Sequence, residues 1–362
     1  MGQAAWRRRF SACACCQPGF AAAATDSGRR NFIAGGLSAL GLGAPAALAQ
    51  QAPGATATKT RIDVHHHYVP PFHADIMATK RSGGRPPKWT PQMSLDEMDK
   101  SGIATAIISL VQPGAWFEED VSLSRRLARD CNDYGAKMIQ DHPGRFGLFA
   151  AIAPPDPDGS LKEIEYVFDT LKADGVGLFT SYGDKYLGDP SFEPVYAELN
   201  RRKAVVYVHP TTPNCCGKVV PGIGPSTIEF ATDSTRTITH VVFSGVAAKF
   251  PDIRWIFSHS GGTLPFLTAR LEIIAQQKKM PGGVMPILQK FYYELAQGNT
   301  AGQLAALLKM VPITQVLYGT DYPFRDGAEV NAGIAAYGFT ADDIRSIERE
   351  IALKLIPRLK QS

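Results

Sequence analysis

The sequence predicts an α/β fold, a (β/α)8 TIM barrel that begins near residue 60. Two observations favour this fold. Short apolar runs rich in β-branched residues alternate eight times with stretches of helical periodicity, which is typical of a parallel sheet covered by helices. Side chains that bind metals stand directly after several of these runs, and the carboxyl ends of the strands are where such a barrel places its active site.

Each of the eight expected strands is a short apolar run. They are expected at residues 62–64, 103–110, 146–152, 176–180, 204–208, 253–258, 291–295 and 313–318. Strands joined by helices in this way are parallel, with right-handed crossovers. A doubly wound open sheet would show the same alternation, but histidines follow the first strand where a nucleotide-binding sheet would have a glycine-rich loop. The closed barrel is therefore favoured.

Helices are expected between the strands, and some have recognisable ends. After a Pro/Gly-rich loop over 69–89, Thr90 predicts an N-cap with proline at the next position, and Gly102 predicts the end of that helix. A capping box predicts that another helix begins at Ser160, and a similar signal at Thr340 starts the last one. Further helices are expected around residues 123–138, 190–202 and 226–250.

The charge of the chain is uneven. The whole chain has 38 basic and 34 acidic residues, a formal net charge of +4. Five of the basic residues and one of the acidic residues lie in the first 49 positions, so 33 of each kind remain and the rest of the chain is neutral. A neutral body offers no electrostatic footprint for nucleic acid or an anionic membrane. We therefore expect neither a nucleic-acid partner nor membrane insertion of the mature domain.

Residues 1–49 have the pattern of an export signal. Arg29 and Arg30 precede an apolar stretch rich in Gly and Ala, and Ala47-Leu48-Ala49 offers a small-residue cleavage site. This arrangement is typical of the twin-arginine signals that carry folded proteins to the bacterial periplasm. An uncleaved membrane anchor is the alternative, although the stretch is shorter than the ~20 residues that span a bilayer. We expect a signal over 1–49, a linker over 50–59, one barrel domain over 60–362, and a periplasmic protein, or a cytoplasmic one if the signal is not functional.

Four of the strand-end side chains predict a metal site. His65 and His67 lie two apart in the first strand, so both point the same way, while His66 points toward the surrounding helices. His209 ends the fifth strand and Asp321 follows the eighth. Three imidazoles and one carboxylate suit one divalent ion, Zn²⁺ first, with Mn²⁺ and Fe²⁺ as alternatives.

His259 ends the sixth strand and comes in addition to these four ligands. We expect it beside the metal as an acid/base or electrostatic group. Cys215 and Cys216 follow the fifth strand, near the expected mouth of the barrel. They could contact metal or substrate as thiolates, join in a disulfide in an oxidising compartment, or have no chemical role. These three alternatives stay open.

Four segments of the sequence together resemble the amidohydrolase superfamily. They are Asp63-Val64-His65-His66-His67, Val208-His209-Pro210, Ser258-His259-Ser260-Gly261-Gly262 and Tyr318-Gly319-Thr320-Asp321-Tyr322-Pro323-Phe324. The branch they resemble most is that of amino-carboxymuconate-semialdehyde decarboxylase, and Thr232–Arg270 looks like the corresponding part of the fungal methylsalicylate decarboxylases. The resemblance covers the chain from about residue 60 to its C-terminal end.

The resemblance implies roles for individual residues. The implied metal ligands are His65, His67, His209 and Asp321, with His259 as the catalytic histidine. It also implies a homodimer in which Arg270 reaches the substrate carboxylate of the neighbouring subunit; a salt bridge on a solvated helix is the other explanation of this arginine. Binuclear members of the superfamily carry a carboxylated lysine at the end of the fourth strand. Residues 177–181 contain no lysine, so the resemblance implies one metal ion.

The leading hypothesis for the function is metal-dependent, non-oxidative decarboxylation of a hydroxylated aromatic or related unsaturated carboxylic acid. The metal would act as Lewis acid and template, and His259 or Asp321 would deliver a proton to the carbon that carries the carboxylate. Hydrolysis of a lactone or amide at the same metal is the second hypothesis, with His259 stabilising the oxyanion. A metal-binding protein without catalysis is the third.

Four further residues are candidate substrate contacts. Arg270 and Arg236 would hold the anionic substrate. Trp89 and Phe324 lie on loops expected at the mouth of the barrel, and their rings would wall a planar small-molecule carboxylate. Aromatic residues in such loops more often only pack a lid, so this role stays an expectation.

Overall fold

The computed structural model describes residues 59–80, 86–117, 120–216 and 219–361. These residues belong to one structural unit, Ala55–Ser362. The predicted export signal over 1–49 and nearly all of the predicted linker over 50–59 lie outside the described residues, so both stay predictions. Within the described ranges, no helix combines the length and the hydropathy that crossing a bilayer would require.

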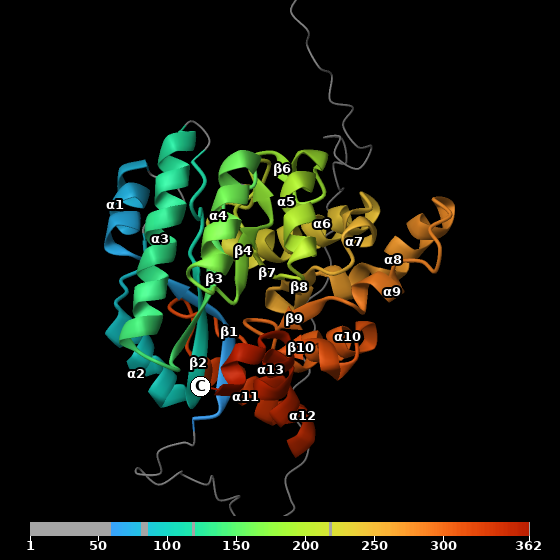
Figure 1. Ribbon diagram of the computed structural model, residues 1–362. Coiled ribbons are helices and arrows are strands. Elements are labelled where there is room, and N and C mark those ends of the chain that lie inside the picture. The colour runs from blue at the N-terminus through green and yellow to red at the C-terminus, as the bar shows by residue number, and fades with distance from the viewer. Residues whose placement is uncertain (1–58, 81–85, 118–119, 217–218, 362) are drawn as a thin grey trace, which may run out of the picture. The chain divides into compact units, whose positions relative to one another are not determined.

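Eight parallel strands form a barrel around which helices are arranged (Figure 1). In order around the barrel the strands are β1 (Arg61–Tyr68), β2 (Ile103–Leu110), β3 (Phe146–Ala151), β4 (Gly175–Phe179), β7 (Val205–His209), β8 (Arg254–Phe257), β9 (Tyr292–Glu294) and β10 (Val316–Leu317). Backbone hydrogen bonds join β1 to β10 and the residues after it: the Val64 amide donates to the Tyr318 carbonyl over 3.1 Å, and the His67 amide donates to the Tyr322 carbonyl over 2.7 Å. The prediction of an eight-stranded parallel α/β barrel is confirmed.

Helices cover the outside of the strands. In chain order they are α1 (Pro71–Lys80), α2 (Pro91–Ser101), α3 (Val121–Asp141), α4 (Pro157–Asp169), α5 (Glu193–Arg201), α6 (Pro225–Phe243), α7 (Val246–Lys249), α8 (Leu264–Gln277), α9 (Met285–Leu288), α10 (Ala301–Met310), α11 (Gly327–Tyr337), α12 (Ala341–Arg345) and α13 (Ile351–Leu355). In Figure 1, α3, α4 and α5 stand side by side along the outer face of the strands. A small antiparallel hairpin, β5 (Ser181–Tyr182) with β6 (Lys185–Tyr186), follows β4.

The predicted ends of two helices are confirmed. The Thr90 hydroxyl accepts a hydrogen bond from the Met93 amide over 3.3 Å and caps α2, and Gly102 ends that helix with a left-handed φ of 70°. Thr340 caps α12 through the reciprocal bonds of a capping box with Asp343. These signals are local, so the sequence alone reveals them.

Two predictions about helices are wrong. The loop predicted over 69–89 contains α1, which buries His73 and Met77 against the barrel, so tertiary packing prevails over the local composition. The helix predicted to begin at Ser160 begins at Pro157. The Asp156 carboxylate accepts a hydrogen bond from the Gly159 amide over 3.3 Å and caps the helix there, with proline at its first position.

Two other elements are shorter than predicted. The helical stretch expected over 226–250 is divided into α6 and α7, because Gly245 adopts a φ of 88° that no helix accommodates. The strand expected over 313–318 is only β10, since Ile313–Gln315 forms a 3-10 turn before it.

Apolar side chains pack the inside of the barrel below the strand ends. This inner core includes Val64, Phe149, Tyr207, Ile256 and Leu317. The rings of Phe149 and Tyr207 stack with centroids 5.4 Å apart. Such a floor fixes the ends of the strands, on which the candidate site residues stand.

Candidate metal centre

The end of β1 is held by a buried aspartate. The Asp63 carboxylate accepts hydrogen bonds from the His65 amide over 3.0 Å and from the Thr320 hydroxyl over 2.7 Å. It also lies 3.0 Å from His66 Nδ1, and the ring of His66 stacks on Tyr322. His66 therefore points away from its two neighbours, as its position in the strand predicts. The bonds to Thr320 tie β1 to the loop after β10.

Side chains from three parts of the barrel converge at its mouth. They are His65, His67, His209 and Asp321, all buried, and we call them the histidine–aspartate cluster. One donor atom from each lies within 4.8 Å of the others. The Nε2 atoms of His65 and His67 both lie 3.1 Å from Asp321 Oδ1. His209 Nε2 lies 4.0 Å from the same oxygen. The structure thus brings the four predicted ligands together.

Hydrogen bonds outside the cluster orient each imidazole. His65 Nδ1 donates to Glu294 Oε1 over 2.8 Å. His67 Nδ1 donates to the Ser109 carbonyl over 3.3 Å, and His209 Nδ1 donates to the carbonyl of the next residue over 2.7 Å. Because these oxygens only accept, each Nδ1 carries a proton, so each Nε2 faces the centre of the cluster and presents a lone pair there once it is deprotonated.

A divalent cation fits this arrangement. Three imidazole lone pairs and one carboxylate face one another in a buried space, where they repel unless positive charge lies between them. Imidazole nitrogen and carboxylate oxygen are ligands that Zn²⁺, Mn²⁺ and Fe²⁺ accept. The bonds to each Nδ1 are those that commonly fix metal-binding histidines. The donor set is therefore that of the one-ion site predicted from the sequence.

Charges in the cluster shift the pKa values of its members. Burial opposes protonation of His65, but the carboxylates of Glu294 and Asp321 outweigh it and raise the pKa of His65 to about 10. Burial lowers the pKa of His67 and, with the neighbouring imidazoles, holds the pKa of His209 well below its usual value. Burial alone would raise the pKa of Asp321, but the charge of His65 and its hydrogen bond hold that pKa well below its usual range. Without metal, a proton on His65 neutralises the ionised aspartate.

Metal binding is expected to release about one proton per ion near pH 8. The pKa of His65 is raised from 6.5 to about 10, so its extra proton must leave before Nε2 can bind an ion. Apparent metal affinity should therefore rise with pH up to about 10. The same proton stabilises the metal-free fold fully below pH 6.5, and that stability is lost as the pH rises toward 10. Calorimetric titration with Zn²⁺ in two buffers of different protonation enthalpy measures the release, and a value near zero contradicts the assignment.

His259 stands beside the cluster on the turn after β8. Its ring centroid lies 5.0 Å from that of His65 and 5.7 Å from that of His209. Its Nδ1 donates to the Ala296 carbonyl over 2.9 Å, which leaves Nε2 free to exchange a proton. His259 thus lies where the sequence predicts it, next to the cluster and outside the set of four.

Two residues at the cluster are not predicted from the sequence. Glu294 ends β9 and contacts His65, and the Gln297 side-chain amide donates to Asp321 Oδ2 over 2.5 Å. Glu294 is a charged residue near the end of the apolar run at 291–295, and the predicted histidine ligands also stand at the ends of such runs. This shared position is a signal that could have pointed to Glu294. Gln297 lies in a loop, and no comparable pattern marks it.

The two aromatic candidates for substrate contact have different positions. Phe324 is 51% exposed, and its ring centroid lies 5.7 Å from that of His67, at the mouth of the barrel. Trp89 is buried, and its indole N–H donates to the Ser94 hydroxyl over 2.8 Å. The polar atom of Trp89 is thus bound inside the protein and its ring packs near Tyr134 of α3, while its role as a substrate contact stays a prediction.

Neither arginine candidate is brought to the cluster within this chain. Arg236 lies 3.7 Å from Asp233 and 3.8 Å from Glu229, so neighbours on α6 compensate its charge. Its Nη2 donates to Cys216 Sγ over 3.7 Å. Arg270 is exposed on α8, and none of the hydrogen bonds or ion pairs found across the described ranges engages it.

Cys215 and Cys216 are joined to each other in a disulfide. Of the three alternatives for this pair, the structure shows the bonded one. Neither sulfur is then a thiolate that could bind the metal or attack a substrate.

A small recess of about 10 Å³, close to the room that one water molecule needs, adjoins His209. Its walls come from β2, β3, β4 and β7 and from the segments that follow the first two. The apolar residues lining it are Leu110, Ala115, Ile152, Leu178 and Phe179. Ser109 and Tyr207 also line this space. The recess therefore marks an apolar wall beside the candidate metal ligands rather than a preformed space for a ligand.

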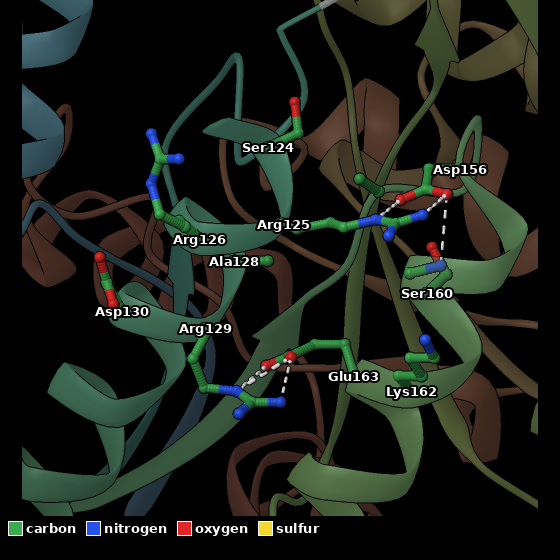
Figure 2. Close-up of a pocket in the computed structure, with 12 residues that line it drawn as sticks. Ser124, Arg125, Arg126, Ala128, Arg129, Asp130, Asp156, Ser160, Lys162 and Glu163 are labelled. Atoms are coloured by element: carbon green, nitrogen blue, oxygen red, sulfur yellow. Dashed lines mark hydrogen bonds and ion pairs between the residues drawn. The ribbon is translucent and has the colours of Figure 1, made fainter. Parts of the chain in front are cut away.

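A second hollow, of about 310 Å³, lies between α3 and α4 and contains none of the cluster residues. Figure 2 shows two of its arginines, Arg125 and Arg129, turned toward carboxylates on the other side of the hollow. Arg125 pairs with Asp156 at 2.6 Å, and Arg129 pairs with Glu163 at 2.8 Å. These pairs join the two helices, so this hollow carries no comparable chemistry. The mouth of the barrel is the better candidate site.

Known proteins similar to this chain include several decarboxylases. The decarboxylase yanB of Aspergillus niger is 34% identical over 326 residues, which cover 83% of this chain and 88% of the relative. The 6-methylsalicylic acid decarboxylase of Penicillium expansum is 34% identical over 316 residues, which cover 83% of this chain and 97% of the relative.

Solved structures share the barrel. A protein described as amidohydrolase II has a TM-score of 0.78 at 28% identity, covering 82% of this chain and 100% of its own. The 5-carboxyvanillate decarboxylase of Novosphingobium aromaticivorans, solved with manganese, has a TM-score of 0.75 at 20% identity, covering 84% of this chain and 97% of its own. At that identity the likeness concerns the fold alone. A family model described as amidohydrolase matches residues 62–357. The resemblance seen in the four sequence segments is thereby confirmed, and the chain belongs to the amidohydrolase family.

Proposed function

We propose that this protein is a metal-dependent, non-oxidative decarboxylase of a hydroxylated aromatic carboxylic acid. The observation that carries the proposal is the histidine–aspartate cluster with His259 beside it and an apolar recess adjoining it. Two relatives that are 34% identical are named decarboxylases, one of them for 6-methylsalicylic acid. The apolar side chains that line the recess form a wall beside the cluster, against which an aromatic ring would pack.

The reaction replaces a carboxylate by a hydrogen atom. A divalent ion held by the cluster would supply Lewis-acid stabilisation and a template for the substrate's oxygens. A proton adds to the ring carbon that bears the carboxylate, and this interrupts the aromatic system. The bond to the carboxylate carbon then breaks, its electron pair restores the ring, and CO2 leaves.

The proton is assigned to His259 rather than Asp321. The pKa of Asp321 lies well below its usual range, since the charge of His65 and its hydrogen bond outweigh burial. Gln297 also donates a hydrogen bond to the second oxygen of this carboxylate. The aspartate therefore stays ionised. His259 has one ring nitrogen fixed by the Ala296 carbonyl and the other free, which is the arrangement that proton delivery requires.

A substrate panel tests this function. Protein loaded with metal is incubated with salicylate, 6-methylsalicylate and 2,6-dihydroxybenzoate, and CO2 and the phenolic product are quantified together. The proposal expects the two products in equal amounts, with 6-methylsalicylate favoured. Lactones and amides are assayed in parallel for the alternative hydrolase. New carboxylate from these, without CO2 from any acid, would overturn the proposal, and turnover of no compound would favour a non-catalytic metal protein.

Zn²⁺ is the proposed resident ion. Three imidazoles and a single carboxylate form a nitrogen-rich set, which suits Zn²⁺ better than the oxygen-rich sets typical of Mn²⁺. The manganese in the 5-carboxyvanillate relative makes Mn²⁺ the alternative. Elemental analysis of protein purified without chelators, followed by reconstitution with each ion, decides between them.

A homodimer is also proposed, in which Arg270 reaches the substrate of the neighbouring subunit. Arg270 has no described partner within its own chain and lies on α8, which follows the turn that carries His259. Two large apolar residues of the same helix, Phe266 and Ile273, are 67% and 55% exposed. Exposed apolar surface of this kind is typical of an interface.

Co-expression of two inactive variants tests this arrangement. Arg270→Ala and His259→Asn should each abolish turnover, whereas a random mixture of the two should recover about a quarter of the wild-type activity. In the mixed dimer, one site then has an intact histidine from one chain and an intact arginine from the other. If Arg270 acts within its own chain, the mixture stays inactive.

Export through the twin-arginine route is proposed for the segment over 1–49. The paired arginines, the apolar stretch and the small-residue site support it. N-terminal sequencing of protein recovered from a bacterial periplasm is expected to begin after Ala49. Recovery of only the uncut chain in the cytoplasm contradicts export.

A further inference from the structure

Glu294 is a buried carboxylate to which the reaction above gives no role. Its Oε1 accepts hydrogen bonds from His65 Nδ1 over 2.8 Å and from the His259 amide over 2.7 Å. Its Oε2 accepts from the Ala296 amide over 2.6 Å. The residue has no exposed surface, so no water replaces these bonds. A single carboxylate therefore contacts a candidate metal ligand, the backbone of the candidate catalytic histidine, and the segment that holds the ring of that histidine.

These contacts hold the turn after β8 in an unusual conformation. His259 and Ser260 have left-handed φ values of 53° and 56°, which residues other than glycine rarely adopt. The His259 amide is anchored on Oε1 of Glu294. Its ring is anchored on the Ala296 carbonyl, and the amide of Ala296 is in turn anchored on Oε2. Glu294 thus holds the backbone of His259 directly and the ring of His259 through Ala296.

The neighbouring backbone leaves space for this carboxylate. A Cβ added to Gly319 would lie 2.3 Å from Glu294 Oε2, closer than any real contact. Because Gly319 has no side chain, the backbone after β10 can pass directly beside the Glu294 carboxylate. A larger residue at this position would displace either the carboxylate or the backbone.

We infer that Glu294 is a positioning residue that couples metal binding to the placement of His259. Through His65 Nδ1 it selects the tautomer whose Nε2 lone pair faces the cluster. Through the His259 amide it sets the distance of the catalytic ring from that same ligand. The second effect rests on the proposed function, whereas the first concerns metal affinity and requires no substrate.

The alternative role for these side chains is a second metal site. His65, His259 and Glu294 together could hold an ion. Most of their donor atoms are already engaged within the protein, because two N–H groups share Oε1 of Glu294 and the His259 Nδ1 proton is used by the Ala296 carbonyl, which leaves His259 Nε2 as the free one. A positioning role needs no second ion, and metal analysis separates the two.

The Glu294→Gln variant tests the inference. An amide has one accepting oxygen, so it cannot satisfy the N–H donors that now meet both carboxylate oxygens. If its NH2 group faces His65, that imidazole must accept at Nδ1, and the proton moves to Nε2, where the ion binds. We expect the Kd for Zn²⁺, measured by chelator competition, to rise by about 10- to 100-fold. The visible spectrum of the Co²⁺-loaded variant should shift, and kcat at saturating metal should fall by about tenfold or more.

Glu163→Gln is the matched control. Glu163 is also a buried glutamate, but it pairs with Arg129 and accepts a bond from Asn132, between α3 and α4 (Figure 2). We expect the Glu163→Gln substitution to lower the Tm of the protein and to leave the Kd for Zn²⁺ and the Co²⁺ spectrum as in the wild type. If Glu294→Gln does not fold, Glu294→Asp is measured instead, and its shorter carboxylate should also weaken Zn²⁺ binding.

The positioning role of Glu294 and the decarboxylase activity are tested by different measurements. A wild-type Kd and Co²⁺ spectrum in the Glu294 variant, or two ions per wild-type chain, would overturn the positioning role. Failure of the wild-type protein to release CO2 from any acid would overturn the decarboxylase proposal, while the Kd and the spectrum would still report on Glu294.

Discussion

The His209→Ala variant is expected to lose its metal ion and at least about 1000-fold in kcat/KM. His209 is the candidate ligand that β7 contributes, and a backbone carbonyl fixes its Nδ1, so its Nε2 is oriented toward the cluster. Alanine leaves three donors and an opening toward the apolar recess. Elemental analysis and CO2 release from 6-methylsalicylate, measured on the same preparation, give both quantities.

His142→Ala provides the control for this variant. His142 caps the C-terminal end of α3 and does not belong to the cluster, so its replacement should leave metal content and turnover unchanged. A His209→Ala protein that keeps one ion per chain and full activity would show that the cluster is not the working site.

The His259→Asn variant is expected to keep its metal and to lose about 100- to 10,000-fold in kcat. The asparagine side-chain amide can replace Nδ1–H in the bond to the Ala296 carbonyl, but it has no second nitrogen to carry a proton. The turn should therefore stay in place while proton delivery stops. Stopped assays at saturating metal measure kcat, and elemental analysis measures the ion.

The two variants separate binding from catalysis. Loss of metal in His259→Asn would make His259 a ligand rather than an acid, because it would then contribute to the ion's coordination. An unchanged kcat would show that Asp321 or water, and not His259, donates the proton to the ring carbon. In D2O, the wild-type enzyme should place one deuterium on the carbon that loses the carboxylate, since the new hydrogen comes from an exchangeable group.

The positions of the candidate metal ligands could be predicted because they depend on strand periodicity. His65, His67 and His209 stand at the ends of apolar runs, and parallel strands bring such ends to one face of the barrel. Glu294 has a similar place in β9, but its role arises from its bonds to His65 and His259, which only the folded chain brings near. The sequence therefore predicts the donors better than the groups that orient them.

Local signals fail where a competing contact decides the structure. Ser160 has the pattern of an N-cap, but Asp156 is followed by proline and caps the helix first. The indole N–H of Trp89 donates to the Ser94 hydroxyl, and the predicted position of Trp89 in a loop does not reveal this contact. Arg270 lies on an exposed helix face, so any role in substrate binding depends on a second copy of the chain.

The central claim is that one ion, held by the histidine–aspartate cluster, makes the protein a decarboxylase. Its most direct test is the titration of metal-free protein with Zn²⁺ while CO2 release from 6-methylsalicylate is followed at each addition. We expect no CO2 release before Zn²⁺ is added, a linear rise in the rate of release with added Zn²⁺, and a break at one ion per chain. Full activity in the metal-free protein, a break at two ions, or a fully loaded protein that releases no CO2 would contradict it.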